Sequence, residues 1–281
     1  MINNEIKPTY IQIPRLRRLA REFTDLSGAA PATRLTYSRM LSQFLEYASA
    51  NDFGFTPEDA RKYMEHLRIN KMLSQNSVRM YFSAFRRFCN YLKNNKLIET
   101  NPARLIKFEE IPHKARPPEY LTRDQIDLLI GSDSPLSIRN KLIIILIIYY
   151  EFPPADIPLL NLSDISHSYN SYKIAGREIF RRHSDIVQIF VKSLNLLEQN
   201  TPLFPCLSRS NQGASLSLRG VRDILRRSLD SAGIKKSPRS ITNTAIIIFA
   251  RKHRSRKKLM QKFGFRHLPT AQSWLKLAAN Y

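Results

Sequence analysis

The feature that most constrains the fold is an apolar run of nine residues, Leu142–Tyr150. A helix that crosses a membrane needs about 20 such residues, so this run predicts a helix buried on all sides inside a folded domain. The chain has 281 residues, which suits two domains because a single core stops growing at about 250–300 residues. With 43% hydrophobic and 24% charged residues, disordered and low-complexity classes are excluded.

Basic residues outnumber acidic ones by a wide margin. The sequence has 45 Lys and Arg against 23 Asp and Glu, a formal net charge of +22. This surplus predicts a polyanionic partner, most simply nucleic acid. The alternatives are a soluble basic protein without such a partner and a protein that lies on an acidic membrane surface.

The surplus is concentrated near the C-terminus. Residues 231–281 contain no acid, and six of the eight residues 251–258 are Lys or Arg. Because apolar segments flank this run, we expect an ordered, phosphate-facing corner between two helices rather than a solvated turn. The candidate phosphate contacts are Arg251, Arg254, Arg256, Lys257 and Lys258.

Conventional active-site motifs are missing from the sequence. The eight glycines form neither GxGxxG nor a P-loop, and the six histidines lack metal-ligand spacing. We therefore expect no cofactor and no metal. Cys89 and Cys206 are expected to be reduced thiols in apolar surroundings, as in a reducing cytosol. Residues 1–10 lack the features of a signal peptide, so we expect a cytoplasmic, nucleoid-associated protein without a membrane anchor.

The hydrophobic periodicity predicts a mainly α protein with one small β-sheet and two domains. Pro- and Gly-containing breaks divide the chain into an N-terminal extension over 1–30, a helical domain over 31–107, a linker over 108–118 and a second domain over 119–281. Within the second domain we expect a hairpin over Ser166–Phe190 and then a helix over Val191–Gln199.

Helix start signals and aromatic spacing organise the first domain. Thr56 followed by Pro57 and two acids predicts a capped helix, as does Thr122 with Gln125 three residues later in the second domain. The helix that begins near Asn76 places aromatic side chains on one face, which is more typical of a core than of base stacking. Its arginines fall on other faces and are the DNA-binding candidates of this domain: Arg79, Arg86 and Arg87.

The order of these segments resembles the tyrosine recombinase (phage integrase) family, in particular its Xer-like and integron-like members. The resemblance covers about Arg34 to Tyr281. The motifs that carry it are Thr36-Tyr37, Ser77-Val78 with Phe82–Phe88, Asn101–Ala103, Tyr120–Gln125 and Leu160–Ile165. It implies a helical, SAM-like core-binding domain that binds DNA, joined to an integrase-type catalytic-like domain.

The same resemblance places the family's catalytic positions on this chain. The "GLRxxEL" turn matches 151–157, the "TPHxLRHT" box matches 237–244, "LGH" matches 263–265 and "TTQxY" matches 270–274. At these positions the first arginine is replaced by Pro153, the first histidine by Arg239, the second arginine by Thr242, the second histidine or tryptophan by Phe265, and the tyrosine nucleophile by Trp274. The hairpin lysine corresponds to Lys173 or Arg177.

These replacements remove the chemistry that the resemblance implies. An indole has no hydroxyl to attack a phosphodiester, and neither proline nor threonine supplies a cationic fork for the transition-state charge. We expect a DNA-binding homologue without catalysis, with its two basic domains closing around duplex DNA. It would be an accessory subunit beside an active recombinase or a repressor-like occupant of its site, with self-association left open. The alternatives are a decaying relic and an active recombinase that uses displaced residues such as Tyr281.

Overall fold

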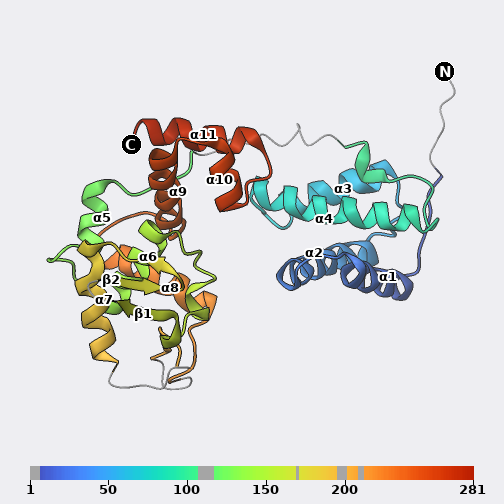
Figure 1. Ribbon diagram of the computed structural model, residues 1–281. Coiled ribbons are helices and arrows are strands. Elements are labelled where there is room, and N and C mark those ends of the chain that lie inside the picture. The colour runs from blue at the N-terminus through green and yellow to red at the C-terminus, as the bar shows by residue number, and fades with distance from the viewer. Residues whose placement is uncertain (1–6, 107–116, 169–170, 195–200, 208–211) are drawn as a thin grey trace. The chain divides into compact units, whose positions relative to one another are not determined.

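The computed structural model describes residues 7–106, 117–168, 171–194, 201–207 and 212–281. The chain divides into two compact units, 1–116 and 117–281 (Figure 1). The expected linker, 108–118, lies mostly outside the described residues. Within the described residues, no helix combines the length and apolarity that a membrane span requires.

The first unit is a bundle of helices around an aromatic core. Its elements are α1 (Ile13–Leu26), α2 (Pro31–Ala50), α3 (Pro57–Ile69), α4 (Gln75–Asn94) and the short 3-10 helix η1 (Pro102–Arg104). The ring of Phe44 is fully buried and lies 4.7 Å from Phe85 and 5.3 Å from Tyr63, measured between ring centroids. The aromatic residues of this domain therefore form its core, as expected from their spacing.

Residues 13–26 form a helix of this bundle, whereas the sequence analysis assigned residues 1–30 to an extension. Helix α1 packs against α2 and α4, and it buries Leu16, Leu19 and Ala20 in the aromatic core. The sequence pattern missed this helix because its apolar positions are interrupted by arginines on the exposed face. An apolar stripe of this kind is enough to hold the helix in the bundle once α2 covers the stripe.

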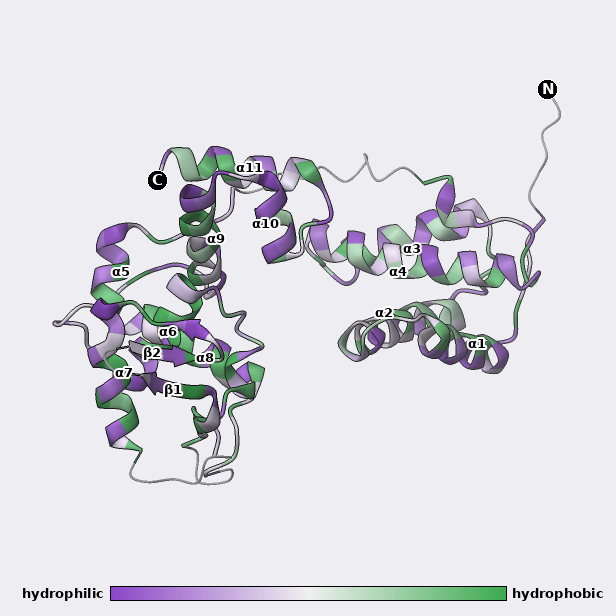
Figure 2. Ribbon diagram, in the orientation of Figure 1, coloured by the Kyte–Doolittle hydropathy of each residue, from purple (hydrophilic) through white to green (hydrophobic). Residues whose placement is uncertain are grey.

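The second unit surrounds the apolar helix predicted from the sequence. Its elements are α5 (Arg123–Ile130), α6 (Ile138–Tyr150), the 3-10 helices η3 (Ile157–Leu159) and η4 (Leu162–Asp164), β1 (Ile165–Ser168), β2 (Ser171–Ile174), β3 (Arg177–Glu178), α7 (Arg181–Ser193), α8 (Leu218–Ser231), α9 (Arg239–His253), α10 (Arg256–Phe263) and α11 (Leu268–Ala279). In α6 every residue from Leu142 to Ile148 is fully buried, and Figure 2 shows its hydrophobic character. The nine-residue run is thus a core helix.

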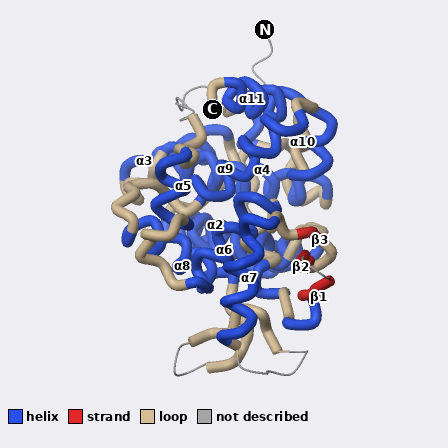
Figure 3. Tube along the Cα trace, turned by 60° about the vertical axis from the view of Figure 1, so that its left-hand side comes forward, coloured by secondary structure: helices blue, strands red, loops and turns tan. Residues whose placement is uncertain are grey.

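The small sheet is shorter than the expected hairpin over Ser166–Phe190. Strands β1, β2 and β3 form an antiparallel meander in that order, with Lys173 opposite Ser166 on one side and Glu178 on the other. The strands end at Glu178, and α7 begins at Arg181, ten residues before the expected helix over Val191–Gln199. Val187 and Phe190 of α7 are buried against the core. Tertiary packing therefore stabilises a helix over Arg181–Ser193, where the polar sequence predicted part of a hairpin. Figure 3 shows how little of the molecule is strand.

Both predicted helix caps are formed, and each is a capping box. The hydroxyl of Thr56 accepts from the backbone N–H of Asp59, and the hydroxyl of Thr122 accepts from that of Gln125. Each N3 side chain returns a contact to the cap backbone. These local bonds satisfy donors that a helix start leaves open, so the sequence alone determines where α3 and α5 begin.

Candidate functional site

The loop that follows α6 carries the first degenerate position, Pro153. Glu151 ends the helix in a left-handed conformation, with φ of 50°, which is a backbone geometry that favours glycine. The sequence comparison predicts that the family turn has its glycine here, and the left-handed backbone of Glu151 is compatible with that prediction. Glu151 also pairs with Lys262 of α10 at 3.3 Å.

Pro153 lines a pocket of about 530 Å³ in the second unit. Arg177 of β3 enters the same pocket, where its guanidinium lies 3.8 Å from the ring centroid of Phe152 and donates a hydrogen bond to the carbonyl oxygen of Tyr150. Lys258 of α10 lines it as well. The structure thus brings together a degenerate position, one of the two candidates for the hairpin lysine, and a residue of the basic corner.

Of the two hairpin candidates, Arg177 is the one that lies in this pocket. Lys173 is exposed on β2, whereas Arg177 is half-buried on β3. The pocket also holds the carboxylates of Glu151 and Asp156. These two carboxylates partly balance the positive charge of the cations that line the pocket. A bound phosphate is therefore not needed to neutralise the pocket.

Two further degenerate positions lie at the start of α9. Arg239 is exposed and Thr242 is half-buried, one helical turn apart on the same side of the helix. The next residues bind the segment that enters the second unit: Asn243 donates its amide to the carbonyl oxygen of Glu119 at 2.7 Å, and the hydroxyl of Thr244 accepts from the backbone N–H of Leu121 at 2.8 Å. The start of α9 is therefore held by polar contacts that are independent of catalysis.

Trp274, which the resemblance predicts to stand at the nucleophile position, is a core residue. Its side chain is only 8% exposed and belongs to a hydrophobic cluster with Ile247 and Ala250 of α9 and Leu259 of α10. Phe265 packs at the edge of the same cluster, its ring stacked on Phe263 at 6.0 Å. Neither residue lines the Pro153 pocket. In this structure both aromatic replacements contribute to packing.

The basic corner between α9 and α10 is ordered. Arg254 ends α9 in a left-handed conformation, and the hydroxyl of Ser255 caps α10 by accepting from the backbone N–H of Lys258. Arg256 donates to the side-chain oxygen of Gln272 on α11 at 3.2 Å. All five predicted cations of the corner are exposed: Arg251, Arg254, Arg256, Lys257 and Lys258. Figure 2 shows the hydrophilic character of α10.

The three arginines of α4 have different environments. Arg79 and Arg87 line a groove of about 490 Å³ between α2 and α4, and Arg87 donates to the hydroxyl of Tyr37 at 2.7 Å while its guanidinium lies 5.7 Å from that ring. Arg87 is exposed. This groove is the place in the first unit where predicted DNA-binding arginines come together.

Arg86 has a structural task that the sequence did not reveal. Its guanidinium donates to the carbonyl oxygens of Ala103 at 3.1 Å and Ile106 at 2.7 Å, and so it fastens the η1 segment to α4. Burial, reinforced by the charge of Arg104, lowers the pKa of Arg86. Because its guanidinium already donates to two backbone carbonyl oxygens, Arg86 is poorly placed to bind a DNA phosphate. The geometry therefore does not favour the sequence-based prediction that Arg86 binds DNA.

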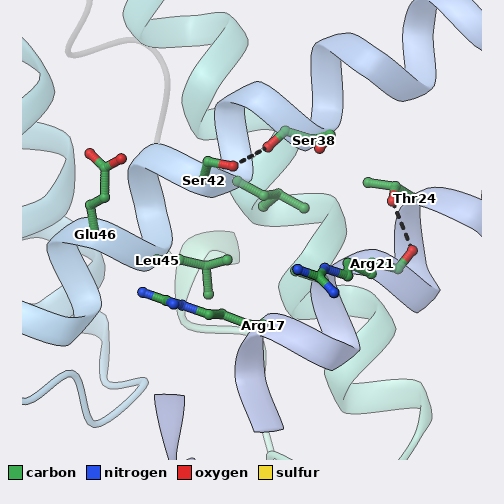
Figure 4. Close-up of a pocket in the computed structure, with 9 residues that line it drawn as sticks. Arg17, Arg21, Thr24, Ser38, Ser42, Leu45 and Glu46 are labelled. Carbon is green, nitrogen blue, oxygen red and sulfur yellow. Dashed lines mark hydrogen bonds between the residues drawn. The ribbon is translucent and has the colours of Figure 1, made fainter. Parts of the chain in front are cut away.

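Helix α1 adds basic residues that the sequence analysis did not single out. Figure 4 shows Arg17 and Arg21 beside a pocket of about 380 Å³ between α1 and α2. The hydroxyls in this pocket serve their own helices: Thr24 donates to the carbonyl oxygen of Arg21 and Ser42 to that of Ser38. The pocket's cationic groups therefore come from α1, a helix whose presence the sequence did not predict.

A buried Tyr–His pair lies near the end of α6. Tyr150 Oη accepts from the backbone N–H of Phe180 and lies 2.9 Å from Nδ1 of His183. Burial raises the pKa of Tyr150 to about 12 and, together with the charge of Arg182, lowers the pKa of His183 to about 4. Both side chains are therefore uncharged at neutral pH, and one hydrogen bond joins Tyr150 Oη to His183 Nδ1. Among the described residues, no group of three or more His, Cys, Asp or Glu could hold a metal ion.

Comparison with known proteins identifies the family. Residues 16–99 match the family described as "Phage integrase, N-terminal SAM-like domain". The tyrosine recombinase XerC of Pelotomaculum thermopropionicum is 22% identical over 242 residues, which cover 77% of this chain and 78% of that protein. XerC of Thermodesulfovibrio yellowstonii is 25% identical over 236 residues, covering 77% and 76%. Residues 16–99 thus belong to the phage integrase SAM-like domain family, and the chain as a whole is similar to tyrosine recombinases.

Solved structures of tyrosine recombinases share the fold. The structure of XerH site-specific recombinase bound to a palindromic difH substrate matches with a TM-score of 0.70 at 15% identity, covering 99% of this chain and 96% of that one. A lambda integrase dimer bound to a core site matches with a TM-score of 0.67 at 14% identity, covering 93% and 94%. The expected mainly α, two-domain tyrosine recombinase fold with a small sheet is therefore confirmed.

Proposed function

We propose that this tyrosine recombinase homologue binds duplex DNA without cleaving it, as an accessory or regulatory factor in site-specific recombination. The observation that carries the proposal is Trp274, which occupies the nucleophile position and is buried in the C-terminal hydrophobic cluster. An indole cannot form the phosphotyrosyl bond by which this family breaks DNA. The proposal thus rests on a chemical replacement rather than on weak overall similarity.

The missing charges support the same conclusion. Transition-state stabilisation by fixed cations is the largest part of such catalysis, and losing one donor costs about 2.7–4 kcal/mol in activation free energy. Pro153 and Thr242 stand where the family has arginines. Arg177 is near Pro153, but it stacks on Phe152 and binds a carbonyl oxygen within its own unit.

DNA affinity needs none of these groups. Binding to duplex DNA depends on phosphate contacts and the release of counterions. The chain has a net charge of +22; its exposed cations include those of the corner 251–258, and the exposed Arg87 and the half-buried Arg79 line one groove of the first unit. The related XerH and lambda integrase were solved on DNA. We infer that both units of this chain bind the same duplex.

The first experiment identifies the DNA sequence that the protein binds. The full chain, purified with its bound DNA fragments, should yield one defined sequence when those fragments are sequenced. A relic without a dedicated role would instead return fragments without a shared sequence. Recovery of the same site from an active recombinase in the same cell would favour the accessory role.

Cleavage is tested on nicked suicide substrates built from the recovered site. The wild-type chain should form no SDS-stable adduct, and Trp274→Tyr should also remain inactive because Pro153 and Thr242 leave the phosphorane charge uncompensated. An active family recombinase on its own site serves as the positive control. Cleavage by the single Trp274→Tyr variant would show that other cations have replaced the two arginines.

A second candidate function is cleavage by a displaced nucleophile. The specific observation in its favour is Tyr281, whose buried hydroxyl lies in a pocket with three arginines. An SDS-stable adduct formed by the wild type and lost in Tyr281→Phe would establish this activity and overturn the proposal of a non-cleaving binder.

The corner 251–258 is tested by the salt dependence of binding. Each phosphate contact contributes about −0.9 to the slope of log affinity against log salt. Replacing Arg254, Arg256, Lys257 and Lys258 by Gln should flatten the slope and weaken all sequences alike. The matched control replaces four exposed cations of α8, Arg219, Arg222, Arg226 and Arg227, and should keep the slope. Equal slopes for the wild type and the corner variant would remove this corner from the interface.

A further inference from the structure

A second pocket in the C-terminal unit is more strongly cationic than the one beside Pro153. Its volume is about 510 Å³, and the two linings share no residue. Consecutive residues of α9 separate them, since Ile248 faces this pocket and Phe249 the other. We call it the Tyr281 pocket, defined by its lining: Arg123, Ile126, Asp127, Tyr149, Arg182, Ile248, Arg251, Lys252 and Tyr281.

The positive charge of the Tyr281 pocket is only partly compensated by the protein. Three guanidiniums and one ammonium face it, and Asp127 is the one acid in the lining. The four cations come from α5, α7 and α9, which are separate elements of the fold. Bringing like charges together is unfavourable unless an anion joins them, so this pocket has the electrostatics of an anion-binding site.

Aromatic rings hold one of these cations in place. The guanidinium of Arg182 lies 4.7 Å from the ring centroid of Tyr149 and 5.6 Å from that of Phe180. A planar guanidinium stacked in this way keeps its N–H edge available for bidentate binding of an oxyanion. The lysine of the set, Lys252, lies 6.0 Å from the ring of Phe180.

Tyr281 adds a hydrogen-bond donor. Its Oη is buried and has no hydrogen-bond partner within the part of the chain that the structure describes, while its ring packs edge-on against Tyr120 at 5.7 Å. Burial raises the pKa of Tyr281, so the hydroxyl keeps its proton at neutral pH. A buried hydroxyl without a partner is unfavourable, and an acceptor oxygen in the pocket would satisfy it.

We propose that the Tyr281 pocket binds the terminal phosphate of a nucleotide, with the arginines and the Tyr281 hydroxyl as donors to its oxygens. The net positive charge of the lining suits a phosphate monoester, which carries more charge than the diester of a continuous strand. The apolar side chains Ile126 and Ile248, with the ring of Tyr149, provide a surface for the nucleoside. A free mononucleotide and the phosphorylated end of a nucleic-acid strand have this same chemistry.

The proposal adds a ligand that DNA binding by the corner does not require. It also assigns Tyr281 a different task from the displaced-nucleophile alternative, because here the hydroxyl donates a hydrogen bond and no covalent bond forms. The two tasks give different products, a reversible complex in one case and an SDS-stable adduct in the other.

The test measures calorimetric binding of AMP to the full chain, with adenosine as the uncharged control. A second arm compares two short oligonucleotides of one sequence, one with a 5′-phosphate and one with a 5′-hydroxyl, so that contacts to the rest of the strand cancel. AMP should bind at least tenfold more tightly than adenosine, or the phosphorylated strand should bind more tightly than its hydroxyl form. The first result identifies a free nucleotide as ligand and the second a strand end.

Variants assign the effect to this pocket. Tyr281→Phe removes one oxygen atom and should weaken binding by about 3- to 10-fold, and Arg251→Gln should weaken it by about 10-fold or more because its contact is charge-assisted. Lys276→Gln, an exposed cation of α11 outside the pocket, is the control for net charge and should bind as the wild type does. If Arg251→Gln fails to fold, Tyr281→Phe decides alone.

Three results would overturn the proposal. One is the absence of any preference for phosphate in both arms. Another is unchanged phosphate binding in Tyr281→Phe and Arg251→Gln, or an equal loss in Lys276→Gln. The third is a covalent adduct that depends on Tyr281. Unchanged duplex binding by the corner variant together with normal AMP binding would refute the proposed corner interface and leave this site standing.

Discussion

Replacing Trp274 by alanine should destabilise the C-terminal end of the second unit. The side chain is 8% exposed and contacts the hydrophobic cluster formed by α9, α10 and α11. A buried tryptophan removes about 150–250 Å² from water, which at about 25 cal/mol per Å² corresponds to roughly 4–6 kcal/mol. Because alanine retains part of this burial, we expect a loss of about 3–5 kcal/mol in the free energy of unfolding.

The assay combines thermal melting with tryptophan emission. Trp274 is the single tryptophan of the chain, so its emission in the wild type reports only on the packing of α11. The far-ultraviolet dichroism of the variant should show a melting temperature lower by about 6–20 °C for a unit of this size, at about 2–4 °C per kcal/mol. Trp274→Tyr should lose less, about 1–2 kcal/mol, because most of the aromatic volume remains.

The control is Lys276→Ala on the same helix, where the side chain is exposed and the change should stay within about 0.5 kcal/mol. The reasoning would be refuted by a melting temperature of Trp274→Ala within 2 °C of the wild type together with wild-type emission typical of an indole in water. In that case Trp274 would face solvent, and its presence at the nucleophile position would have no structural explanation.

Three further predictions concern individual side chains. Arg86→Ala should lower the free energy of unfolding by about 1.5–3 kcal/mol, because two charge-assisted hydrogen bonds to backbone carbonyls are lost. Arg87→Ala should instead lower DNA affinity with little change in the melting temperature. The reverse pattern would contradict a structural role for Arg86 and a DNA-binding role for Arg87. Arg254→Gly should raise unfolding free energy by up to about 1 kcal/mol, since Arg254 has a φ of 46°, while it weakens DNA binding by one phosphate contact. The pKa of His183 is depressed to about 4 in the folded chain, so between its unfolded value of about 6.5 and pH 4 the unfolded state binds the extra proton and stability falls as pH falls. The loss should be about 1–2 kcal/mol after a discount for solvent screening, and His183→Gln should flatten the pH dependence measured by urea titration.

Local signals predicted the parts of the fold that depend on neighbours in the chain. The apolar run became α6, and the threonines at 56 and 122 cap α3 and α5 as their spacing indicated. Two turns predicted from the family resemblance also have the backbone conformation that a glycine would adopt there. Glu151 and Gly264 both have left-handed backbone conformations, at the two positions where the resemblance predicts the glycines of the family motifs.

Other elements depended on contacts that no local pattern records. Helix α1 needed α2 to cover its apolar stripe, and α7 replaced a predicted hairpin because Val187 and Phe190 reach the core. Arg86 looked like a surface arginine, yet it is bound to carbonyls of the η1 segment.

The sequence by itself determined the resemblance to tyrosine recombinases, the mainly helical class, the excess of positive charge and the absence of a tyrosine at position 274. These properties are carried by residue identity and spacing. Only the tertiary structure decided that Trp274 is a core residue, that Arg177 rather than Lys173 lies beside Pro153, and that Tyr281 shares a pocket with Arg123 and Arg182. Each of these depends on which faces of distant elements are buried against one another, and that is fixed by packing of the whole unit rather than by local sequence.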